Sequence, residues 1–275
     1  SGSCRDQSPG RVGEHHSKKE LGKDMYQFFI EDENAAEDFV TIEGSDVNHI
    51  KNVLRMKPGE KIRVCTRNGQ NYFCSISDIT ESFVRADILE KEAESTELPC
   101  RIYLFQGLPK NDKMEWIIQK TVELGVYEVI PVAMKNCVVK LDDKKAKSKV
   151  MRWQAIAESA AKQSKRSLIP EVKMPMSYKE AVAYAKELDV KLVPYENEHG
   201  MAGTKAAMEQ IKKGESIAVF IGPEGGFAPE EIEMVRDEMQ LISLGRRILR
   251  TETAGIAALA ILGYQLESQT DGRDE

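Results

Sequence analysis

Two loops of the chain combine residue types that could hold a ligand and act on it. The first reads Ile221-Gly222-Pro223-Glu224-Gly225-Gly226-Phe227 and lies between an apolar run and a segment that begins at Pro229. Glycine tolerates positive φ angles and lets a ligand approach the backbone closely. A tight turn would account for one or two of these glycines, so a turn and a ligand site both remain open. The spacing matches neither the G-x-G-x-x-G fingerprint nor a Walker A motif, which disfavours the usual dinucleotide and P-loop functions.

The second loop carries three arginines within five residues, Arg246, Arg247 and Arg250. It follows an expected strand and precedes an expected helix, for which Thr251 would serve as the N-cap. Guanidinium groups bind anions through paired N–H donors, and a helix N-terminus adds its backbone amides. A solvated charged loop is the alternative. Ile248 and Leu249 interrupt the charges, which favours an anion-binding site.

Two kinds of domain are expected to position these loops. Residues 25–98 read as short strands separated by turn signals such as Asn68-Gly69, with a helical stretch around Val47–Leu54, and predict a small β-barrel. The expected strands are Met25–Ile30, Phe39–Ile42, Lys61–Cys65, Asn71–Ile79 and Ser82–Glu90. Residues 99–268 alternate strands with helices, which predicts an α/β domain with a mostly parallel sheet.

Within the α/β domain the hydrophobic pattern sets the expected elements. The strands are Ile102–Gln106, Val129–Ala133, Lys191–Pro194, Ile217–Ile221 and Leu241–Leu244. The helices are Lys113–Leu124, Lys149–Gln163, Glu180–Leu188, Lys205–Ile211, one from Pro229, and Thr251–Leu266. Residues 269–275 are expected to form a tail. Residues 1–24 are polar and rich in glycine and serine, which indicates a disordered leader or an artificial remnant.

Composition narrows the class of protein. The net charge is −6, from 39 basic and 45 acidic residues, which by itself argues against a nucleic-acid partner. Two segments depart from this balance: residues 49–67 hold six basic residues and one acidic residue, and residues 135–166 hold ten and three. A solvated charged face is the ordinary explanation of each, and a nucleic-acid contact is the other.

Several classes are disfavoured. No run of eighteen apolar residues predicts a membrane span, and the N-terminus lacks a secretory signal. The five cysteines include no C-x-x-C pair, and the body of the chain holds only His49 and His199. We therefore expect no metal site, no disulfide framework and a reducing, cytoplasmic location.

The final helix is apolar on every side between Gly255 and Tyr264. Such a helix should be buried all round. The core of one subunit and the interface of a homodimer would both satisfy this requirement.

The two loops together resemble the S-adenosylmethionine loops of SPOUT-class RNA methyltransferases. More narrowly, the chain resembles the 16S ribosomal RNA uridine-N3 methyltransferase family, through Ile221–Phe227, Leu244–Ala254, His49–Met56, Lys113–Val126 and Trp153–Val172. The resemblance covers about Met25 to Leu266. It implies a PUA-like β-barrel domain followed by an α/β SPOUT domain with a deep C-terminal trefoil knot. It also implies a homodimer through the C-terminal helix region, acting on 16S rRNA in the small ribosomal subunit.

The resemblance also implies functional residues. The cofactor-binding residues would be Pro194, Tyr195, Glu196, Ile221, Gly222, Pro223, Glu224, Gly225, Gly226, Leu244, Gly245, Ile248, Leu249 and Thr251. A cation would stabilise the charge that develops on uridine when N3 loses its proton. Arg250 is the first candidate and Arg247 the second. Glu252 would accept the proton, orient Arg250 or cap the helix, and solvent could take the proton instead.

The RNA is expected to follow the two basic segments. The predicted contacts are Lys51, Arg55, Arg63, Arg67, Lys162 and Arg166. The chain departs from the family at Gln27, where an arginine is common, and at Ala228, where a serine-like cap is usual. Three alternatives stay open: an RNA-binding ribosome-assembly factor without catalysis, a methyltransferase acting on another RNA, and a phosphate-binding α/β enzyme.

Overall fold

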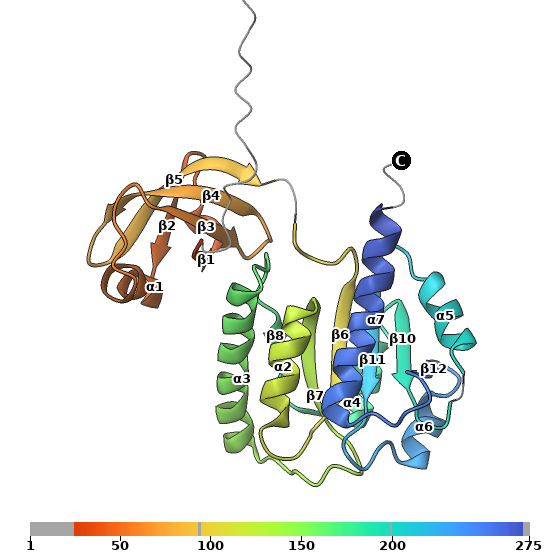
Figure 1. Ribbon diagram of the computed structural model, residues 1–275. Coiled ribbons are helices and arrows are strands. Elements are labelled where there is room, and N and C mark those ends of the chain that lie inside the picture. The colour runs from red at the N-terminus through yellow and green to blue at the C-terminus, as the bar shows by residue number, and fades with distance from the viewer. Residues whose placement is uncertain (1–24, 93–94, 199, 272–275) are drawn as a thin grey trace, which may run out of the picture.

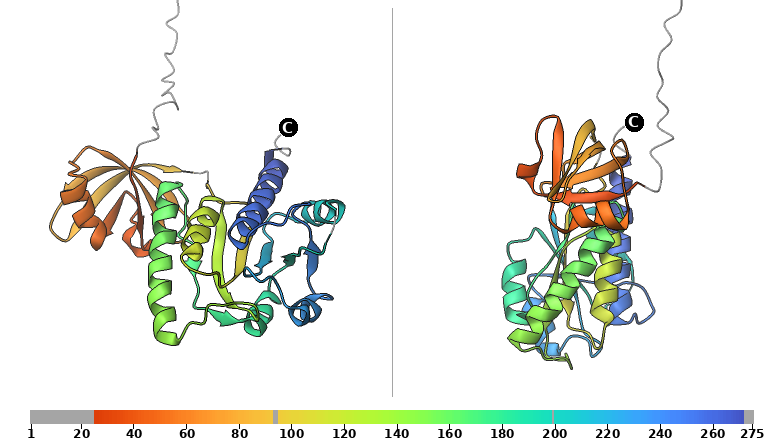
Figure 2. Two further views of the ribbon diagram at one scale, coloured as in Figure 1. Left: turned by 60° about the horizontal axis from the view of Figure 1, so that its bottom comes forward. Right: turned by 90° about the vertical axis from the view of Figure 1, so that its left-hand side faces the viewer.

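The computed structural model describes residues 25–92, 95–198 and 200–271, which form a small β domain beside a larger α/β domain (Figures 1 and 2). The small domain holds β1 (Gln27–Ile30), β2 (Phe39–Glu43), β3 (Lys61–Thr66), β4 (Asn71–Ile79) and β5 (Phe83–Glu92). These confirm the five expected strands. They form one sheet in the order β1-β3-β4-β5-β2, and the edge strands β1 and β2 lie against each other, so the sheet is strongly curled.

The helical stretch of the small domain differs from a plain α-helix. After a 3-10 turn at Asp32–Asn34, the chain forms α1 (Ser45–Asn48) and then a π-helical turn, η2 (His49–Val53). Val47 and Ile50 are buried as expected, whereas Val53 is 61% exposed. A π-turn holds more residues than an α-turn, so it rotates Val53 away from the apolar face that helical spacing predicts.

The α/β domain has seven strands and six helices in its described residues. The strands are β6 (Arg101–Gly107), β7 (Val126–Ala133), β8 (Glu171–Val172), β9 (Met176–Ser177), β10 (Val190–Pro194), β11 (Ser216–Ile221) and β12 (Gln240–Ile242). The helices are α2 (Lys113–Glu123), α3 (Asp143–Gln163), α4 (Tyr178–Ala185), α5 (Ala202–Glu209), α6 (Pro229–Val235) and α7 (Thr251–Asp271). Every strand pair is parallel, in the order β12-β10-β11-β6-β7-β8, with β9 also beside β7.

Helices cover both faces of this sheet, which explains its continuous apolar strands. Side chains of α2, α3, α5 and α7 share one core, and those of α4 and α6 share the other. The residues of β11 alternate between the two: Val219 joins the first core, whereas Phe220 joins the second and stacks on Phe105 of β6 at 4.4 Å between ring centroids.

The parallel register brings the carboxyl ends of four strands to one edge of the sheet. Ile221 pairs with Gln106, and Pro194 pairs with Ile242. The loops that follow β6, β10, β11 and β12 therefore emerge side by side, at the lower edge in Figure 1. This edge is where an open α/β sheet places its ligands.

Two helices are longer than their sequence pattern predicts. α3 begins at Asp143 because the Asp142 side chain accepts a hydrogen bond from the Lys145 amide at 2.8 Å, which caps the first turn. α7 continues to Asp271, three residues into the expected tail. No glycine or proline interrupts the sequence between Gly263 and Gly272, so nothing stops the helix sooner.

Three of the predicted RNA contacts instead join the two domains. Arg166 is 3% exposed, pairs with Glu97 and donates to the Val126 carbonyl at 2.5 Å. The Arg63 guanidinium donates to Glu92 at 2.7 Å and to the Lys165 carbonyl at 3.2 Å. Burial makes Arg166 structural, which corrects its predicted role. Arg63 is half-buried, and its guanidinium is occupied by these partners.

Lys162 and Gln27 also make contacts between the two domains. The Lys162 ammonium, the third predicted contact, lies 3.4 Å from Asp46 of α1 and 2.8 Å from Glu158 of its own helix. Gln27, which stands where the resembled family often has an arginine, is buried and donates to the Arg166 carbonyl at 2.5 Å. The basic charge of this region is therefore largely used within the molecule.

The sequence predicts neither a membrane span nor a metal site, and the structure can be compared with these two predictions only over the residues that it describes. None of the helices in that part of the chain is long and apolar enough to cross a membrane. Nor do those residues include a group of three or more His, Cys, Asp or Glu side chains placed to hold a metal ion.

Arg166→Ala should lower the free energy of unfolding by about 3 kcal/mol, because it leaves Glu97 and two carbonyls partly buried without their cation. Arg152→Ala is the matched control, since it removes a surface pair in which the arginine side chain is 68% exposed, and it should cost no more than about 1 kcal/mol. Urea unfolding measures both. Equal losses would show that the Arg166 contacts do not hold the junction.

Candidate active site

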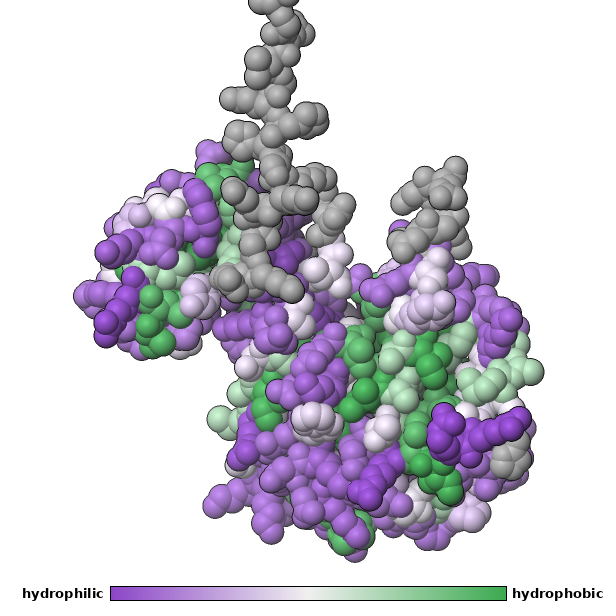
Figure 3. Space-filling model, viewed as in Figure 1, coloured by the Kyte–Doolittle hydropathy of each residue, from purple (hydrophilic) through white to green (hydrophobic). Residues whose placement is uncertain are grey.

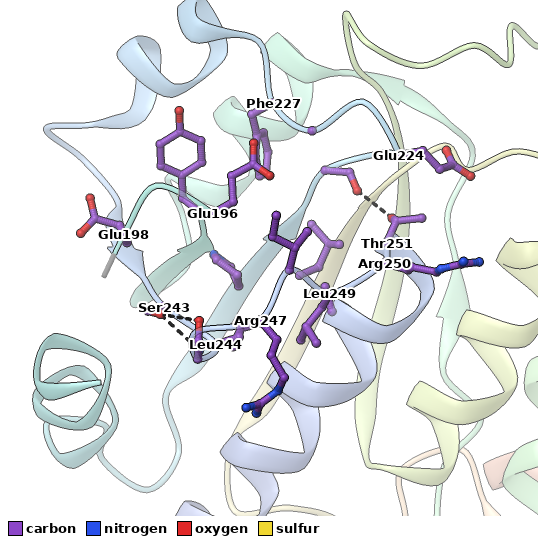
Figure 4. A pocket seen from close by; sticks show the side chains of 18 of the residues that line it. Glu196, Glu198, Glu224, Phe227, Ser243, Leu244, Arg247, Leu249, Arg250 and Thr251 are labelled. Carbon is purple, nitrogen blue, oxygen red and sulfur yellow. Dashed lines mark hydrogen bonds between the residues drawn. The ribbon is translucent and has the colours of Figure 1, made fainter. Parts of the chain in front are cut away.

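An open cavity of about 640 Å³ lies at the carboxyl edge of the sheet (Figure 4). The loops that follow β10, β11 and β12 form its walls. Thirteen of the fourteen predicted cofactor residues line it, and so do Arg247 and Arg250. The predicted site residues do not include the remaining lining residues, which are Lys113, Glu198, Phe227, Ser243, Arg246 and Ala254. Of these, Phe227 and Arg246 belong to the two loops that the sequence analysis singled out.

The loop after β11 folds tightly back on itself. The Gly226 amide donates to the Pro223 carbonyl at 2.9 Å, and Gly226 has a φ of +67°, where a side chain would be strained. A Cβ on Gly222 would lie only 3.2 Å from the Gly226 carbonyl carbon. The glycines therefore allow the loop to fold back closely on itself.

Gly225 is the predicted cofactor residue that does not line the cavity. A Cβ on Gly225 would lie 2.9 Å from the Cβ of Asn136, which follows β7. The Asn136 amide group donates to the carbonyls of Gly225 and Gly226, at 3.0 and 3.2 Å. Gly225 is thus needed where the loop packs on its neighbour.

Thr251 connects the two loops to the sheet. Its hydroxyl donates to the Gly222 carbonyl at 2.7 Å and accepts from the side-chain amide of Gln106 at 2.9 Å. The N-cap role expected for Thr251 is therefore wrong: the Arg250 carbonyl accepts the first helical hydrogen bonds, from Thr253 and Ala254. The threonine side chain fixes where α7 begins relative to β6 and β11.

The helix after the glycine loop is capped without a serine. Ala228 has no side-chain acceptor, and its own amide donates to the Glu231 carboxylate at 2.8 Å. The second oxygen of Glu231 accepts from the Lys135 amide at 2.8 Å. This buried carboxylate compensates for the departure at Ala228 and ties the loop after β7 to α6.

Charged groups gather on one side of the cavity. The Lys113 ammonium lies 3.1 Å from Glu224 and 3.2 Å from Glu252, and the Lys110 amide donates to Glu224 at 2.9 Å. Burial raises the pKa of Glu224 and of Glu252, but hydrogen bonds and Lys113 outweigh it, so both pKa values lie below the ordinary value. Both carboxylates are therefore charged at neutral pH.

Lys113 could have been found from the sequence. It opens the helix that follows β6, and the carboxyl ends of parallel strands meet at one edge, so its side chain belongs beside the glycine loop.

The arginines have no such partners. Within the described residues, neither Arg247 nor Arg250 makes a side-chain ion pair or hydrogen bond, and both are exposed. Figure 4 shows them leaving the loop in different directions. The site thus combines an apolar wall that includes Ile221, Leu244 and Leu249 with free guanidinium groups at its rim. It can hold a ligand with a flat apolar part and stabilise negative charge beside it.

Comparisons with known proteins agree with the two-part architecture. Residues 96–263 match the family model of an RNA methyltransferase domain, and residues 42–89 match that of an RNA methyltransferase PUA domain. Ribosomal RNA small subunit methyltransferase E of Bacillus subtilis is 39% identical, over 88% of this chain and 98% of its own. The protein of that name from Mesomycoplasma hyopneumoniae is 36% identical, over 86% and 97%.

A solved structure extends the likeness to the fold. The crystal structure of Ribosomal RNA small subunit methyltransferase E from Neisseria gonorrhoeae, bound to S-adenosyl methionine, matches with a TM-score of 0.75 and 32% identity. The match covers 87% of this chain and 97% of that one.

Gly107→Ala should destabilise the protein by roughly 1–3 kcal/mol, because its Cβ would lie 2.7 Å from the Pro223 nitrogen where β6 meets the glycine loop. Gly203→Ala in α5 is the control: its Cβ meets open space, and alanine should stabilise the helix by up to about 1 kcal/mol. Urea unfolding again measures both. A Gly107→Ala protein as stable as the parent would contradict this close packing.

Proposed function

Because this chain belongs to the ribosomal RNA small subunit methyltransferase E family, we propose that it transfers a methyl group from S-adenosylmethionine to N3 of one uridine in 16S rRNA. The observation that carries the proposal is the cavity built by the loops after β10, β11 and β12. It lies in a fold shared with a relative that was solved with S-adenosyl methionine bound.

The residues of the cavity suit this cofactor. A volume of about 640 Å³ is within the range of small-molecule sites. Apolar side chains would contact the adenosine, and the tight backbone at Gly222 and Gly226 would accept a close approach. The residues that would hold the cofactor are Pro194, Tyr195, Glu196, Ile221, Gly222, Pro223, Glu224, Gly226, Leu244, Gly245, Ile248, Leu249 and Thr251.

The bound cofactor supplies a methyl group activated on a sulfonium, so the chain has to orient the uridine and stabilise its charge. Loss of the N3 proton leaves negative charge shared among N3, O2 and O4. Arg250, at the rim and without a partner among the described residues, is our assignment for the stabilising cation, with Arg247 as the second.

In this proposal Glu252 does not accept the N3 proton. Its carboxylate is held by Lys113, and its pKa lies below the ordinary value because hydrogen bonding and the Lys113 charge outweigh burial. A carboxylate stabilised in this way is a weak base, and solvent at the open rim receives the proton instead.

The RNA would contact the basic surfaces that stay exposed. The first half of α3 and the loop before it present Lys140, Lys144, Lys145, Lys147 and Arg152, and hydrophilic side chains cover this part of the surface in Figure 3. In the small domain, Arg55 and Arg67 are exposed, and Lys51 is partly so beside Glu81. The Arg67 side chain pairs with Glu31 and remains 75% exposed, so it is still accessible to phosphate.

We also propose a homodimer and a trefoil knot. Figure 3 shows apolar side chains gathered over α7. Ile248, in the loop before α7, is 85% exposed, and Tyr264 of α7 is 76% exposed. A second copy would bury these side chains, and light scattering in solution measures that assembly. The knot is supported by the path of the chain, which returns from the edge strand β12 to the middle of the sheet, where Thr251 meets Gly222 and Gln106.

Arg250→Ala should reduce kcat for methyl transfer by about 100-fold or more, because it removes the cation that faces the developing charge. Small ribosomal subunits from cells lacking this enzyme are the substrate, and mass spectrometry of the rRNA maps the modified base. Calorimetry with S-adenosylhomocysteine should give a Kd within about threefold of the parent, since Arg250 serves the transition state and not the cofactor.

Arg236→Ala provides the control, since Arg236 is the exposed C-cap residue of α6 and pairs only with Glu233 among the described residues. Wild-type turnover by Arg250→Ala would overturn the assignment. A parent protein that binds the cofactor but leaves every uridine unmodified would overturn the proposed reaction in favour of a non-catalytic assembly factor.

A variant with Lys144, Lys145 and Lys147 changed to glutamine should bind an rRNA fragment less tightly. The slope of log affinity against log salt should fall by roughly two, since each lost phosphate contact releases about 0.7 fewer counterions on single strands. Lys205→Gln on α5, whose ammonium is exposed beside Glu209, serves as the control. An unchanged salt slope would exclude this surface from the RNA path.

A further inference from the structure

Lys113 occupies a position that its own helix disfavours. It is the first residue of α2, where the helix dipole and the free backbone amides repel a cation. Two carboxylates offset this repulsion: Glu224 at 3.1 Å, from the loop after β11, and Glu252 at 3.2 Å, from the first turn of α7. The ammonium is thereby fixed between the two loops that build the cavity.

The two carboxylates do not depend on Lys113 equally. Glu224 also accepts the Lys110 amide at 2.9 Å. For Glu252, the Lys113 ammonium, 3.2 Å from Oε2, is the one side-chain cation within ion-pair distance among the described residues, and besides it only the residue's own backbone amide is a hydrogen-bond donor that lowers its pKa. If Lys113 lost its charge, Glu252 would keep a partly buried negative charge without a cation, which is an unfavourable state.

Arg250 is close enough to Glu252 to neutralise that charge. It precedes Glu252 by two residues, and its positive charge already lowers the pKa of Glu252 as a smaller contribution after Lys113. Its guanidinium is exposed and has no ion pair among the described residues. A flexible side chain of this length can turn toward the carboxylate once nothing else neutralises it.

We propose that Lys113 is a positioning residue for the proposed methyl transfer: by neutralising Glu252, it keeps the Arg250 guanidinium free to face the target base. Without Lys113, Arg250 pairs with Glu252 and is drawn away from the rim of the cavity. This inference rests on the proposed function for the role of Arg250 in the reaction. The competition between the two cations for Glu252 does not depend on it.

A purely mechanical role predicts something different. Lys113 also links α2 to both cavity loops, so its loss could loosen the site. In that case, removing Glu252 as well would leave the loops equally loose or looser. Under our proposal, removing Glu252 eliminates the carboxylate that captures Arg250, so the second substitution repairs the first.

The experiment compares Lys113→Gln, Glu252→Gln and the double variant with the parent. Phenylglyoxal labelling followed by peptide mass spectrometry measures the reactivity of the Arg250 guanidinium, and Arg247 in the same loop is the internal reference. In Lys113→Gln the reactivity of Arg250 should fall about three- to tenfold relative to Arg247, the range of a partly exposed ion pair that gains strength from burial. The double variant should return to the level of Glu252→Gln alone.

Methyl transfer provides the second readout. The kcat of Lys113→Gln should fall by the same factor as the labelling, because both report the fraction of molecules with a free guanidinium. The Kd for S-adenosylhomocysteine should stay within about threefold, since binding of the cofactor does not use Arg250. Lys120→Gln is the control. Lys120 also lies in α2, and its ammonium pairs with Glu123, three residues further along the same helix.

Two outcomes separate the inference from the function. A double variant that labels and turns over no better than Lys113→Gln would overturn the inference and leave the methyltransferase function standing. Restored Arg250 labelling in a protein that methylates no uridine would overturn the function and leave the competition for Glu252 established.

Discussion

The hydroxyl of Thr251 joins the three chain segments on which the cavity depends. It donates to the Gly222 carbonyl and accepts from Gln106, so one buried group fixes the glycine loop, the end of β6 and the start of α7. A hydroxyl is suited to this position because it both donates and accepts. An alanine there would leave the Gly222 carbonyl without this donor and one N–H of the Gln106 amide without an acceptor, and a valine would add volume without repairing either. These two hydrogen bonds fix the first residue of α7, and they thereby fix where the arginine loop before it must end.

The parallel register explains why so many loops can share one site. Four neighbouring strands end at the same edge, so residues far apart in the sequence, such as Lys113 and Glu252, lie within 3.2 Å. The periodicity of the strands predicts this convergence in general terms. It does not predict which charged groups will pair, because that depends on side-chain reach and on the tight packing of Gly107 and Gly225 against neighbouring loops.

Sequence reasoning therefore identified the elements and the cavity-lining residues better than the roles of the charged groups. The strands of the small domain, five of the seven strands of the α/β domain and the loops at Gly222 and Arg247 follow from local patterns in the sequence. The two-residue strands β8 and β9 were not predicted, because they are too short to show a hydrophobic pattern. Arg63 and Arg166 were predicted to contact RNA because they belong to basic segments, but their partners Glu92 and Glu97 come from the end of the small domain and the linker. A count of charges along the chain cannot distinguish a lysine or arginine that is used inside the fold from one that remains free.

The same distinction bears on the net charge of −6. At physiological ionic strength the field of a charge is screened over about 8 Å. Acidic residues elsewhere on the molecule therefore do not cancel an exposed basic surface. Instead, they weaken the binding of nucleic acid to the parts of the molecule where they lie. Burying Arg166 and pairing Lys162 at the domain junction removes basic charge from the middle of the molecule. Exposed cations remain at the rim of the cavity, on the first half of α3 and on the small domain. On the part of the α/β domain around α4, α5 and α6, the exposed Lys186, Lys205 and Arg236 each pair with a glutamate. An enzyme that has to find one base in a large RNA gains from this arrangement, because phosphate contacts away from these surfaces add affinity for every site and discrimination for none.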